Sequence, residues 1–185
     1  MKPETICIQA GYSPKNGEPR VMPIYQSTTY KYDSAQTLGE LFDLKQEGHM
    51  YSRISNPSVA FVEEKVSQLE GGVGAMMTSS GQAAILISIL NLCSAGDNFV
   101  CSSAIYGGTV NLFSVTLKRM DIECRFILPN ASLEEIEAQI DGRTKLIYGE
   151  SLTNPSLDVL DIEKFAQAAH AHSIPLIVDN TFPTP

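Results

Sequence analysis

Four clusters of polar and glycine residues follow apolar stretches of the sequence, at the places where buried strands would end. They are TSSGQ at 78–82, SAIYGGT at 103–109, ESLTNPS at 150–156 and DNTF at 179–182. The ligands of open α/β sheets bind at the carboxyl ends of the strands. If the strands are parallel, all four clusters lie on the same rim of the sheet and can form one site.

Asp179 carries the sharpest chemical signal among these residues. It follows the apolar run 174–178, and a carboxylate in such a place costs free energy unless it is paired. One interpretation is an N-cap or the partner of a buried arginine. The other is a counter-charge for a cationic ring nitrogen, which would keep that nitrogen protonated and make the ring an electron sink.

The TSSGQ cluster runs from a predicted strand directly into a predicted helix. The free N–H groups of this helix start, with the hydroxyls of Ser79 and Ser80 nearby, could hold a phosphate. Gly81 would permit close approach of the ligand to the backbone. A plain turn with an N-cap explains the same residues equally well. The cluster is neither a Walker loop nor a GxGxxG dinucleotide fingerprint.

Two further residues on this rim suit a flat ligand. Tyr106 opens a predicted helix, and its ring could either stack on a cofactor or cover the core with its hydroxyl in water. Asn154 precedes a proline, so it is either part of a turn or an amide that hydrogen-bonds a ligand oxygen. Together the four clusters describe a flat, phosphorylated, nitrogen-bearing cofactor, and pyridoxal 5′-phosphate (PLP) fits that description.

The elements that must position these clusters alternate regularly from residue 57 onward. Apolar spacing, a capping box at Ser132 and Glu135, and Asp161 as an N-cap mark the helices. We predict helices over 57–72, 81–97, 106–120, 132–142 and 161–173, and strands over 74–80, 98–103, 122–127, 144–151 and 174–180. The helix at 81–97 is apolar on most faces and is therefore expected to be buried. Alternating strands and helices, with strands that read as continuous apolar runs, predict an α/β fold with a mostly parallel sheet covered on both faces.

Residues 1–56 differ from the rest of the chain. They are rich in turn formers, as in GYSPKNGEPR and ISNPS, and show little periodicity. We interpret them as an extended N-terminal arm with one short helix near 37–47. Such an arm is stable only if it packs on its own domain or on a neighbouring subunit.

Composition excludes several classes of function. With 43% hydrophobic and 18% charged residues, the 185-residue chain can build one sizeable core. The net charge of −8 and the absence of a basic run argue against nucleic acid as a partner. The N-terminus has no apolar region typical of a signal peptide, and the longest apolar stretch, AAILISILNLC, is too short to span a membrane, so we expect a cytoplasmic protein. The four cysteines are scattered without metal-ligand spacing and are expected to be reduced, and no metal site is predicted.

Seven ordered motifs resemble those of one known family. The chain is similar to the Cys/Met-metabolism PLP-dependent enzymes, a branch of the aspartate-aminotransferase-like fold. The motifs are PIYQSTTY, YSRISNP, LEGG, TSSGQAA, YGGT, ESLTNPSLDV and VDNTF. The resemblance covers essentially the whole chain. It implies that residues 57–185 form the first part of the PLP-binding large domain, that PLP is the cofactor, and that the protein is a homo-oligomer built as a dimer of dimers.

The resemblance also implies roles for matching residues. Gly81 and Gln82, next to Ser80, resemble the residues whose backbone amides bind the PLP phosphate. Tyr106 resembles the tyrosine that stacks on the cofactor ring. Asp179 resembles the aspartate that pairs with the pyridine nitrogen. Tyr106 and Asp179 are therefore expected to belong to the catalytic centre.

The resemblance implies further contacts with the cofactor, from four more positions of the chain. Asn154 and Thr181 match residues that line the cofactor, with Asn154 near its phenolic oxygen. Tyr51 and Arg53 resemble residues that reach the phosphate bound by a neighbouring subunit, which would explain what the arm packs against. The planar guanidinium of Arg53 suits the geometry of a phosphate group.

Within the family, LFDLKQEGHMYSR and SSGQAA look most like O-acetylhomoserine sulfhydrylases, which make homocysteine from a small amino-acid substrate and sulfide. Methionine γ-lyases typically carry Cys at the position of Gly108, so glycine there argues against that activity. Cystathionine γ-synthase and the cystathionine lyases remain alternatives.

One family motif is missing from the sequence. The lysine that holds PLP covalently lies in a Ser-x-Thr-Lys stretch in the family, and no lysine of this chain stands in such a stretch. The C-terminal small domain is missing as well. We therefore expect the chain to be an N-terminal portion of the enzyme. The alternative function is that these 185 residues alone form an inactive fragment.

Overall fold

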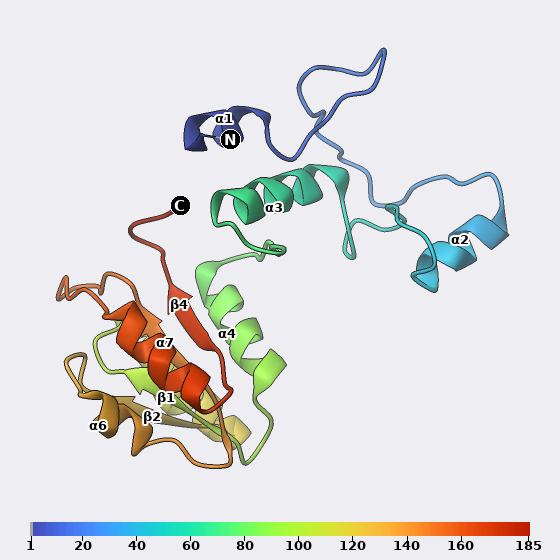
Figure 1. Ribbon diagram of the computed structural model, residues 1–185. Helices are drawn as coiled ribbons and strands as arrows, with labels where there is room; N and C mark the ends of the chain where they lie inside the picture. The colour runs from blue at the N-terminus through green and yellow to red at the C-terminus, as the bar shows by residue number, and fades with distance from the viewer. Residues whose placement is uncertain (1) are drawn as a thin grey trace. The chain divides into compact units, whose positions relative to one another are not determined.

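The computed structural model describes residues 2–185, which form two compact units (Figure 1). The first unit extends to Met77, and the second covers Thr78–Thr184. The sequence places a boundary after residue 56, whereas the structure groups the helix that begins at Pro57 with the first unit. The expected contact of residues 1–56 with a neighbouring subunit stays a prediction.

The first unit contains three helices joined by long irregular segments. They are α1 (Pro3–Gln9), α2 (Ala35–Phe42) and α3 (Pro57–Leu69). The predicted helix at 57–72 is confirmed: the Asn56 side chain accepts the N–H of Ser58 at its start, and Gly71 follows its end in the left-handed conformation. The predicted helix at 37–47 begins earlier, because Ser34 caps it, and ends at Phe42, two residues before Leu44 adopts a positive φ.

Helix α1 is absent from the prediction. It has only seven residues, and none of its own side chains is buried. It is held by tertiary contacts with α3, where the Lys65 ammonium donates a hydrogen bond to the carbonyl of Cys7. Short helices of this kind depend on packing rather than on propensity, so the local sequence gives little sign of them.

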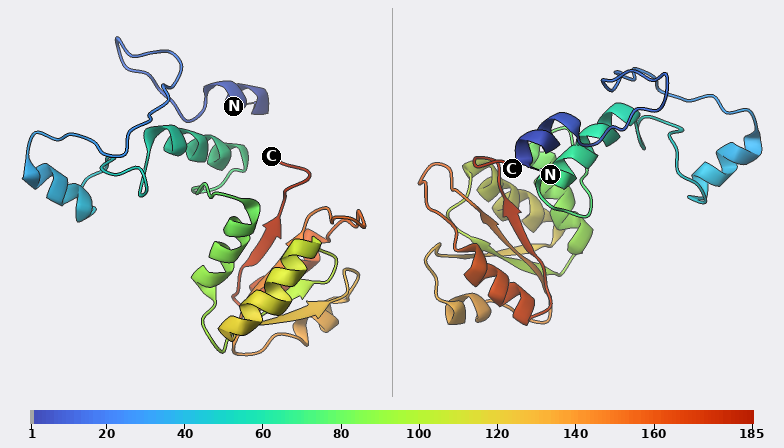
Figure 2. Two further views of the ribbon diagram at one scale, coloured as in Figure 1. Left: turned by 180° about the vertical axis from the view of Figure 1, so that it is seen from behind. Right: turned by 45° about the horizontal axis from the view of Figure 1, so that its top comes forward.

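The second unit is a four-stranded, all-parallel sheet with helices on both faces (Figure 2). The strand order is β2-β1-β3-β4, which confirms the predicted α/β architecture. The strands are β1 (Asn98–Ser102), β2 (Glu123–Ile127), β3 (Thr144–Glu150) and β4 (Leu176–Asp179). The helical elements are α4 (Gly81–Leu92), α5 (Gly107–Asn111), η1 (Leu112–Thr116), η2 (Leu117–Met120), α6 (Leu133–Glu137) and α7 (Ile162–Ala171).

Side chains of successive residues in the central strands pack into two separate hydrophobic cores, one on each side of the sheet. On one face, Phe99 and Tyr148 pack with α4 and the helical stretch from α5 to η2. On the other face, Val100 and Ile147 pack with α6 and α7. Burial on both faces explains why these strands have continuous apolar sequences. It also makes the rim of the sheet the place where polar side chains can gather.

The predicted starts of the helices around the sheet agree with the structure, but α4 and α6 each end five residues before the predicted boundary. Ser132 and Glu135 form both hydrogen bonds of the capping box at the start of α6. Asp161 accepts the N–H of Lys164 at the start of α7. The predicted helix at 106–120 is helical throughout, but it changes from α to π to 3-10 geometry along its length.

Two predictions around α4 are wrong. Residues 74–80 form no strand, because a strand requires a hydrogen-bonded neighbour and no strand of the described residues pairs with them. Their side chains are largely exposed, with Met76 at 65%. Helix α4 is also not buried on most faces, since Ile89 alone among its residues is buried, while Ile87 and Leu90 are exposed.

Candidate functional site

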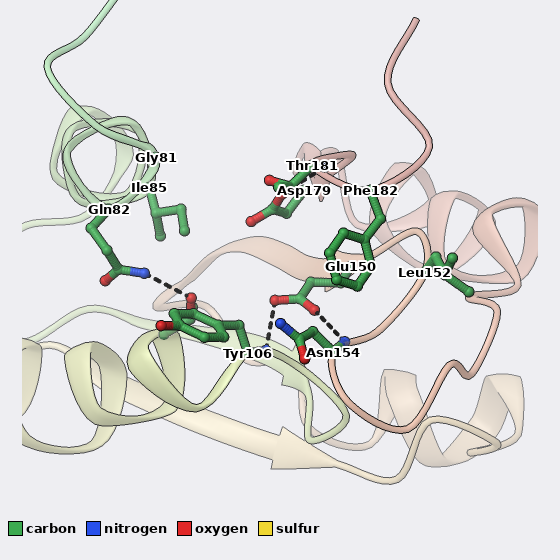
Figure 3. Close-up of a pocket in the computed structure, with 11 residues that line it drawn as sticks. Gly81, Gln82, Ile85, Tyr106, Glu150, Leu152, Asn154, Asp179, Thr181 and Phe182 are labelled. Carbon is green, nitrogen blue, oxygen red and sulfur yellow. Dashed lines mark hydrogen bonds between the residues drawn. The ribbon is translucent and has the colours of Figure 1, made fainter.

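The second unit has a pocket at the point where the order of its strands reverses. The chain passes from β1 to β2 on one side and then places β3 on the other side of β1. In such sheets the loops that follow the two central strands diverge and leave a crevice. A pocket of about 270 Å³ lies in this region (Figure 3). It is lined by Gly81, Gln82, Ile85, Tyr106, Thr109, Glu150, Leu152, Asn154, Asp179, Thr181 and Phe182.

The start of α4 forms one wall of the pocket. The hydroxyl of Ser80 accepts the N–H of Ala83 (3.1 Å) and so caps the helix. The amides of Gly81 and Gln82 belong to the first turn, where helix geometry provides no intrahelical acceptor. A Cβ built on Gly81 would meet no atom within 4 Å, so the space beside this backbone is open. The wall can therefore donate N–H groups to an anion.

Tyr106 forms the opposite part of the pocket, where the chain leaves β1 and enters α5. Its ring is 49% exposed and is not part of a packed core. Gly108 lies directly against this ring: a Cβ at that position would stand 2.5 Å from Cε1 of Tyr106. The side-chain amide of Gln82 donates to the hydroxyl of Thr109 (3.1 Å), which ties this segment to the start of α4.

Asp179 ends strand β4 and holds its carboxylate at the pocket. The backbone N–H of Thr181 donates to Oδ1 (3.0 Å), and the hydroxyl of Thr181 donates to the same oxygen. The hydroxyl of Tyr148 donates to Oδ2 (3.1 Å). No ion pair of Asp179 with an arginine is present among residues 2–185, so that interpretation of the sequence has no support in the described part of the chain.

Tyr148 is the buried support of Asp179. Its ring is fully buried and packs edge-on against Phe113. Burial first, and then the adjacent Asp179 carboxylate, raise the pKa of Tyr148 well above its ordinary value. The phenol therefore stays protonated at physiological pH and acts only as a donor to the carboxylate.

Glu150 is the principal pocket residue that sequence reasoning misses. It ends β3 and pairs in register with Asp179 on β4, so two carboxylates stand side by side. Its Oε1 accepts the N–H of Tyr106 (2.6 Å), and its Oε2 accepts the N–H of Asn154 (3.3 Å). Burial raises the pKa of Glu150, the two N–H groups oppose that rise, and Asp179 adds to it.

The structure brings together most of the predicted site residues. Those that line the pocket are Gly81, Gln82, Tyr106, Asn154, Asp179 and Thr181. Ser80 supports the wall as the cap of α4 and is not itself a lining residue. Tyr51 and Arg53 belong to the first unit, where the guanidinium of Arg53 lies 5.4 Å from the centre of the Tyr51 ring.

Some lining residues gave no chemical signal in the sequence. Leu152 and Phe182 are the apolar members of two of the clusters, and Ile85 lies one helical turn after Gly81. Glu150 could have been found as the acidic residue at the end of an apolar strand, the same signal that identified Asp179.

The lining of the pocket is acidic. It contains two carboxylates and no lysine or arginine. An anion bound in this unit would therefore depend on N–H and hydroxyl groups, while a cationic group would find two negative charges. The four cysteines are free, and no three His, Cys, Asp or Glu side chains within residues 2–185 are grouped to hold a metal ion. None of the helices described above is long and apolar enough to cross a membrane.

Comparison with protein-family models gives a match over residues 4–185 to the Cys/Met metabolism PLP-dependent enzymes. O-acetyl-L-homoserine sulfhydrylase of Corynebacterium glutamicum is 45% identical over 182 residues, which are 98% of this chain and 42% of that protein. O-acetyl-L-homoserine sulfhydrylase 1 of Thermus thermophilus is also 45% identical, over 98% of this chain and 44% of that protein. The chain thus spans about two fifths of the length of these curated relatives.

Solved structures show the same fold. A Campylobacter jejuni protein, provisionally described as an O-acetylhomoserine (thiol)-lyase with N′-pyridoxyl-lysine-5′-monophosphate, matches with a TM-score of 0.95 and 38% identity. The match covers all of this chain and 45% of that one. Cystathionine γ-lyase of Lactobacillus plantarum, in complex with L-serine, matches with a TM-score of 0.87 and 34% identity, over 98% of this chain and 45% of that one.

Proposed function

The chain belongs to the Cys/Met-metabolism PLP-dependent enzymes, and on that basis we propose that the protein carrying it is an O-acetylhomoserine sulfhydrylase. Such an enzyme makes homocysteine from O-acetylhomoserine and sulfide. The observation that carries the proposal is the pocket at the strand ends. There the open amides of α4, the exposed ring of Tyr106 and the carboxylate of Asp179 surround one space.

The donor set of this pocket fits PLP. The amides of Gly81 and Gln82 would bind its phosphate, because they are open donors at the positive end of a helix. The ring of Tyr106 offers a flat, exposed surface on which a pyridine ring can stack. The acidic lining suits a protonated ring nitrogen. Asn154 and Thr181 add polar groups at the edge of the same space.

PLP, when bound, supplies an electron sink for charge that develops at the α-carbon of an amino acid. Asp179 would hold a proton on the pyridine nitrogen, and Tyr148 restrains the Asp179 carboxylate by donating to Oδ2. Thr181 holds the other carboxylate oxygen through two donors. Asn154 would donate its side-chain amide to the phenolic oxygen.

The choice of substrate within the family is supported by the comparisons and by Gly108. Several relatives that match at 43–45% identity are named O-acetylhomoserine sulfhydrylase or homocysteine synthase. A side chain at position 108 would collide with the Tyr106 ring, so the present ring position requires glycine. The cysteine typical of methionine γ-lyases would need a different arrangement here.

We further propose that the enzyme is a homo-oligomer, a dimer of dimers, in which Tyr51 and Arg53 reach the phosphate bound by a neighbouring subunit. The acidic lining supports this proposal. The pocket itself contributes no cationic side chain to a doubly charged phosphate, and a guanidinium from another subunit would supply one.

The test of the function is an assay of the complete protein that carries this chain. Purified protein is supplied with PLP, O-acetylhomoserine and sulfide, and homocysteine is measured beside α-ketobutyrate release from methionine and cystathionine formation from cysteine. We expect homocysteine formation to be the fastest reaction. Faster formation of cystathionine or faster cleavage of methionine would overturn the assignment.

A further inference from the structure

Glu150 occupies an unusual position between two walls of the pocket. It is 5% exposed, and its side chain lies between the Tyr106 segment and the Asn154 loop (Figure 3). One carboxylate oxygen accepts a backbone N–H 44 positions earlier in the chain, and the other accepts an N–H four positions later. The side chain therefore connects the loop after β1 with the loop after β3.

Both hydrogen bonds require a carboxylate. The two partners are N–H donors, so each oxygen of Glu150 must act as an acceptor, which an ionised carboxylate does and a glutamine side chain does at only one of its two ends. Keeping this charge buried beside Asp179, its partner in the β-ladder, costs free energy. The two charge-assisted hydrogen bonds offset part of that cost.

The hydrogen bond from the N–H of Tyr106 to Glu150 also restrains the backbone around Tyr106. Tyr106 is the N-cap of α5, so its N–H sits where the chain turns from the strand end into the helix. Holding this N–H fixes the backbone from which the ring projects. Gly108 permits the present ring position, because a Cβ at 108 would stand 2.5 Å from Cε1 of the ring.

We propose that Glu150 is a positioning residue of the pocket, whose two carboxylate oxygens hold the backbone of Tyr106 and of Asn154 so that both side chains face one ligand. The identity of that ligand as PLP rests on the proposed function. The connection between the two loops does not, because it is formed by residues of this chain alone.

The first test is amide hydrogen exchange on the complete protein without cofactor, followed by mass spectrometry of peptides that contain Tyr106 or Asn154. Glu150→Gln keeps the size of the side chain and removes one of the two acceptors. Because glutamine keeps one acceptor, we expect exchange to accelerate by about tenfold in at least one of the two peptides, as when one hydrogen bond near 1.4 kcal/mol is lost. Glu163→Gln, an exposed glutamate at the start of α7, is the matched control and should leave both peptides unchanged.

A second variant separates this effect from general unfolding. Glu150→Asp keeps the charge but is shorter by one methylene, so it cannot reach both donors. It should accelerate exchange in at least one of the same two peptides and leave peptides from β1 and β3 at their wild-type rates. Unchanged exchange at Tyr106 and Asn154 in both variants would overturn the proposal, and so would equal acceleration throughout the second unit.

The consequence for the ligand is measured by PLP titration and by circular dichroism in the absorption band of the bound cofactor. Glu150→Gln should raise the Kd for PLP about tenfold and reduce the dichroic signal, because the stacked ring loses its fixed orientation. Gly108→Ala should alter the dichroic signal without accelerating exchange at Asn154. Accelerated exchange with an unchanged Kd and spectrum would also overturn the positioning role. If the activity assay contradicts the sulfhydrylase assignment but these effects are observed, the positioning role of Glu150 still holds.

Discussion

At the scale of single residues, the hydrogen bonds of Asp179 determine what its carboxylate can offer to a ligand. Oδ1 already accepts two hydrogen bonds from Thr181, whereas Oδ2 accepts one, from Tyr148. A carboxylate oxygen can accept more than one hydrogen bond, so Oδ2 keeps capacity for a further donor. A protonated ring nitrogen would be such a donor.

Replacing Asp179 by Asn in the complete protein should keep the fold and remove most of the turnover. The amide is close in size and can still accept from either Tyr148 or Thr181, but it carries no negative charge for a ring nitrogen. We expect kcat to fall by about 10²-fold or more, measured as homocysteine formation. Near-wild-type kcat would contradict the role of Asp179.

The matched control for this variant is Tyr148→Phe. It removes the donor to Oδ2 but leaves the carboxylate charged, so it should lower kcat much less than Asp179→Asn does. Asp179→Ala is a poorer choice, since it would leave the buried hydroxyl of Tyr148 without an acceptor, at a cost of about 1–3 kcal/mol.

Glu150 should give the protein a specific pH dependence of stability. The pKa of Glu150 is raised by burial above its ordinary value of about 4.3. A raised pKa in the folded state means that the contribution to stability is fully present below the unfolded pKa and is lost as the pH rises through the folded pKa. Relative to wild type, the melting temperature of apo Glu150→Gln should therefore increase from about pH 4 to about pH 7.

The quantity to follow with pH is the difference between the melting temperatures of Glu150→Gln and wild type, not either melting temperature alone. At any single pH the melting temperature of Glu150→Gln also reflects its altered hydrogen bonds, whereas the change of the difference with pH follows the ionisation of Glu150. A difference that stays constant, or that changes in the opposite direction, would show that the pKa of Glu150 is not raised.

A functional residue could be predicted from the sequence where a charged side chain follows a run of apolar residues. Asp179 was identified in this way, and the structure places it at the pocket. Glu150 stands in a similar context, as the first residue of the ESLTNPS cluster, but the prediction for that cluster concerns Asn154. Its partner Tyr106 lies 44 positions away, so nothing in the local sequence indicates that the carboxylate connects two loops.

At the scale of elements, the N-caps of the helices and four of the five predicted strands agree with the structure, and only the strand at 74–80 is absent. A capping interaction involves residues within one turn, so Ser132, Glu135 and Asp161 could be identified from spacing alone. The predicted strand at 74–80 depended on a pairing partner that the local sequence does not specify. The exposed residues of α4 have the same explanation, because apolar character does not determine which neighbours are present to cover it.

The cap of α4 should affect both stability and cofactor binding. Ser80→Ala removes the acceptor for the N–H of Ala83 and should destabilise the protein by about 1 kcal/mol. Because the same turn offers the amides of Gly81 and Gln82, the Kd for PLP should also rise, measured by titration of the apo-protein.

Ser132→Ala provides the comparison for this variant. It removes an equivalent cap from α6, which contributes no residue to the pocket, so it should cost a similar free energy and leave the Kd for PLP unchanged. An equal effect of both variants on the Kd would mean that the α4 terminus has no special part in binding.

At the scale of the whole molecule, the acidic pocket and the N-terminal arm both bear on which cationic group binds the cofactor phosphate. The pocket lining has no cationic side chain, while Arg53 in the first unit forms no ion pair among the described residues and lies beside the ring of Tyr51. The expectation that Arg53 serves the phosphate of a neighbouring subunit can be tested by mixing subunits.

Two variants that should each have little activity if both proposals hold, Arg53→Ala and Asp179→Asn, are unfolded together and reassembled as mixed oligomers. If Arg53 acts on the neighbouring subunit, a mixed pair contains one site with both native residues and one with neither. Reassembly in equal amounts should then restore about a quarter of the wild-type activity. If Arg53 acts within its own subunit, every site lacks one residue and no activity returns.

The separation of Tyr106 and Glu150 along the chain also has a consequence for protein synthesis. The hydrogen bond between them joins a loop that leaves the ribosome early to a strand end that leaves 44 residues later. At about 5–20 residues per second, that interval lasts on the order of a few seconds. During this time β1 and β2 can already be made, but the Tyr106 loop has no acceptor. The two walls of the pocket can therefore be joined only after translation has passed β3.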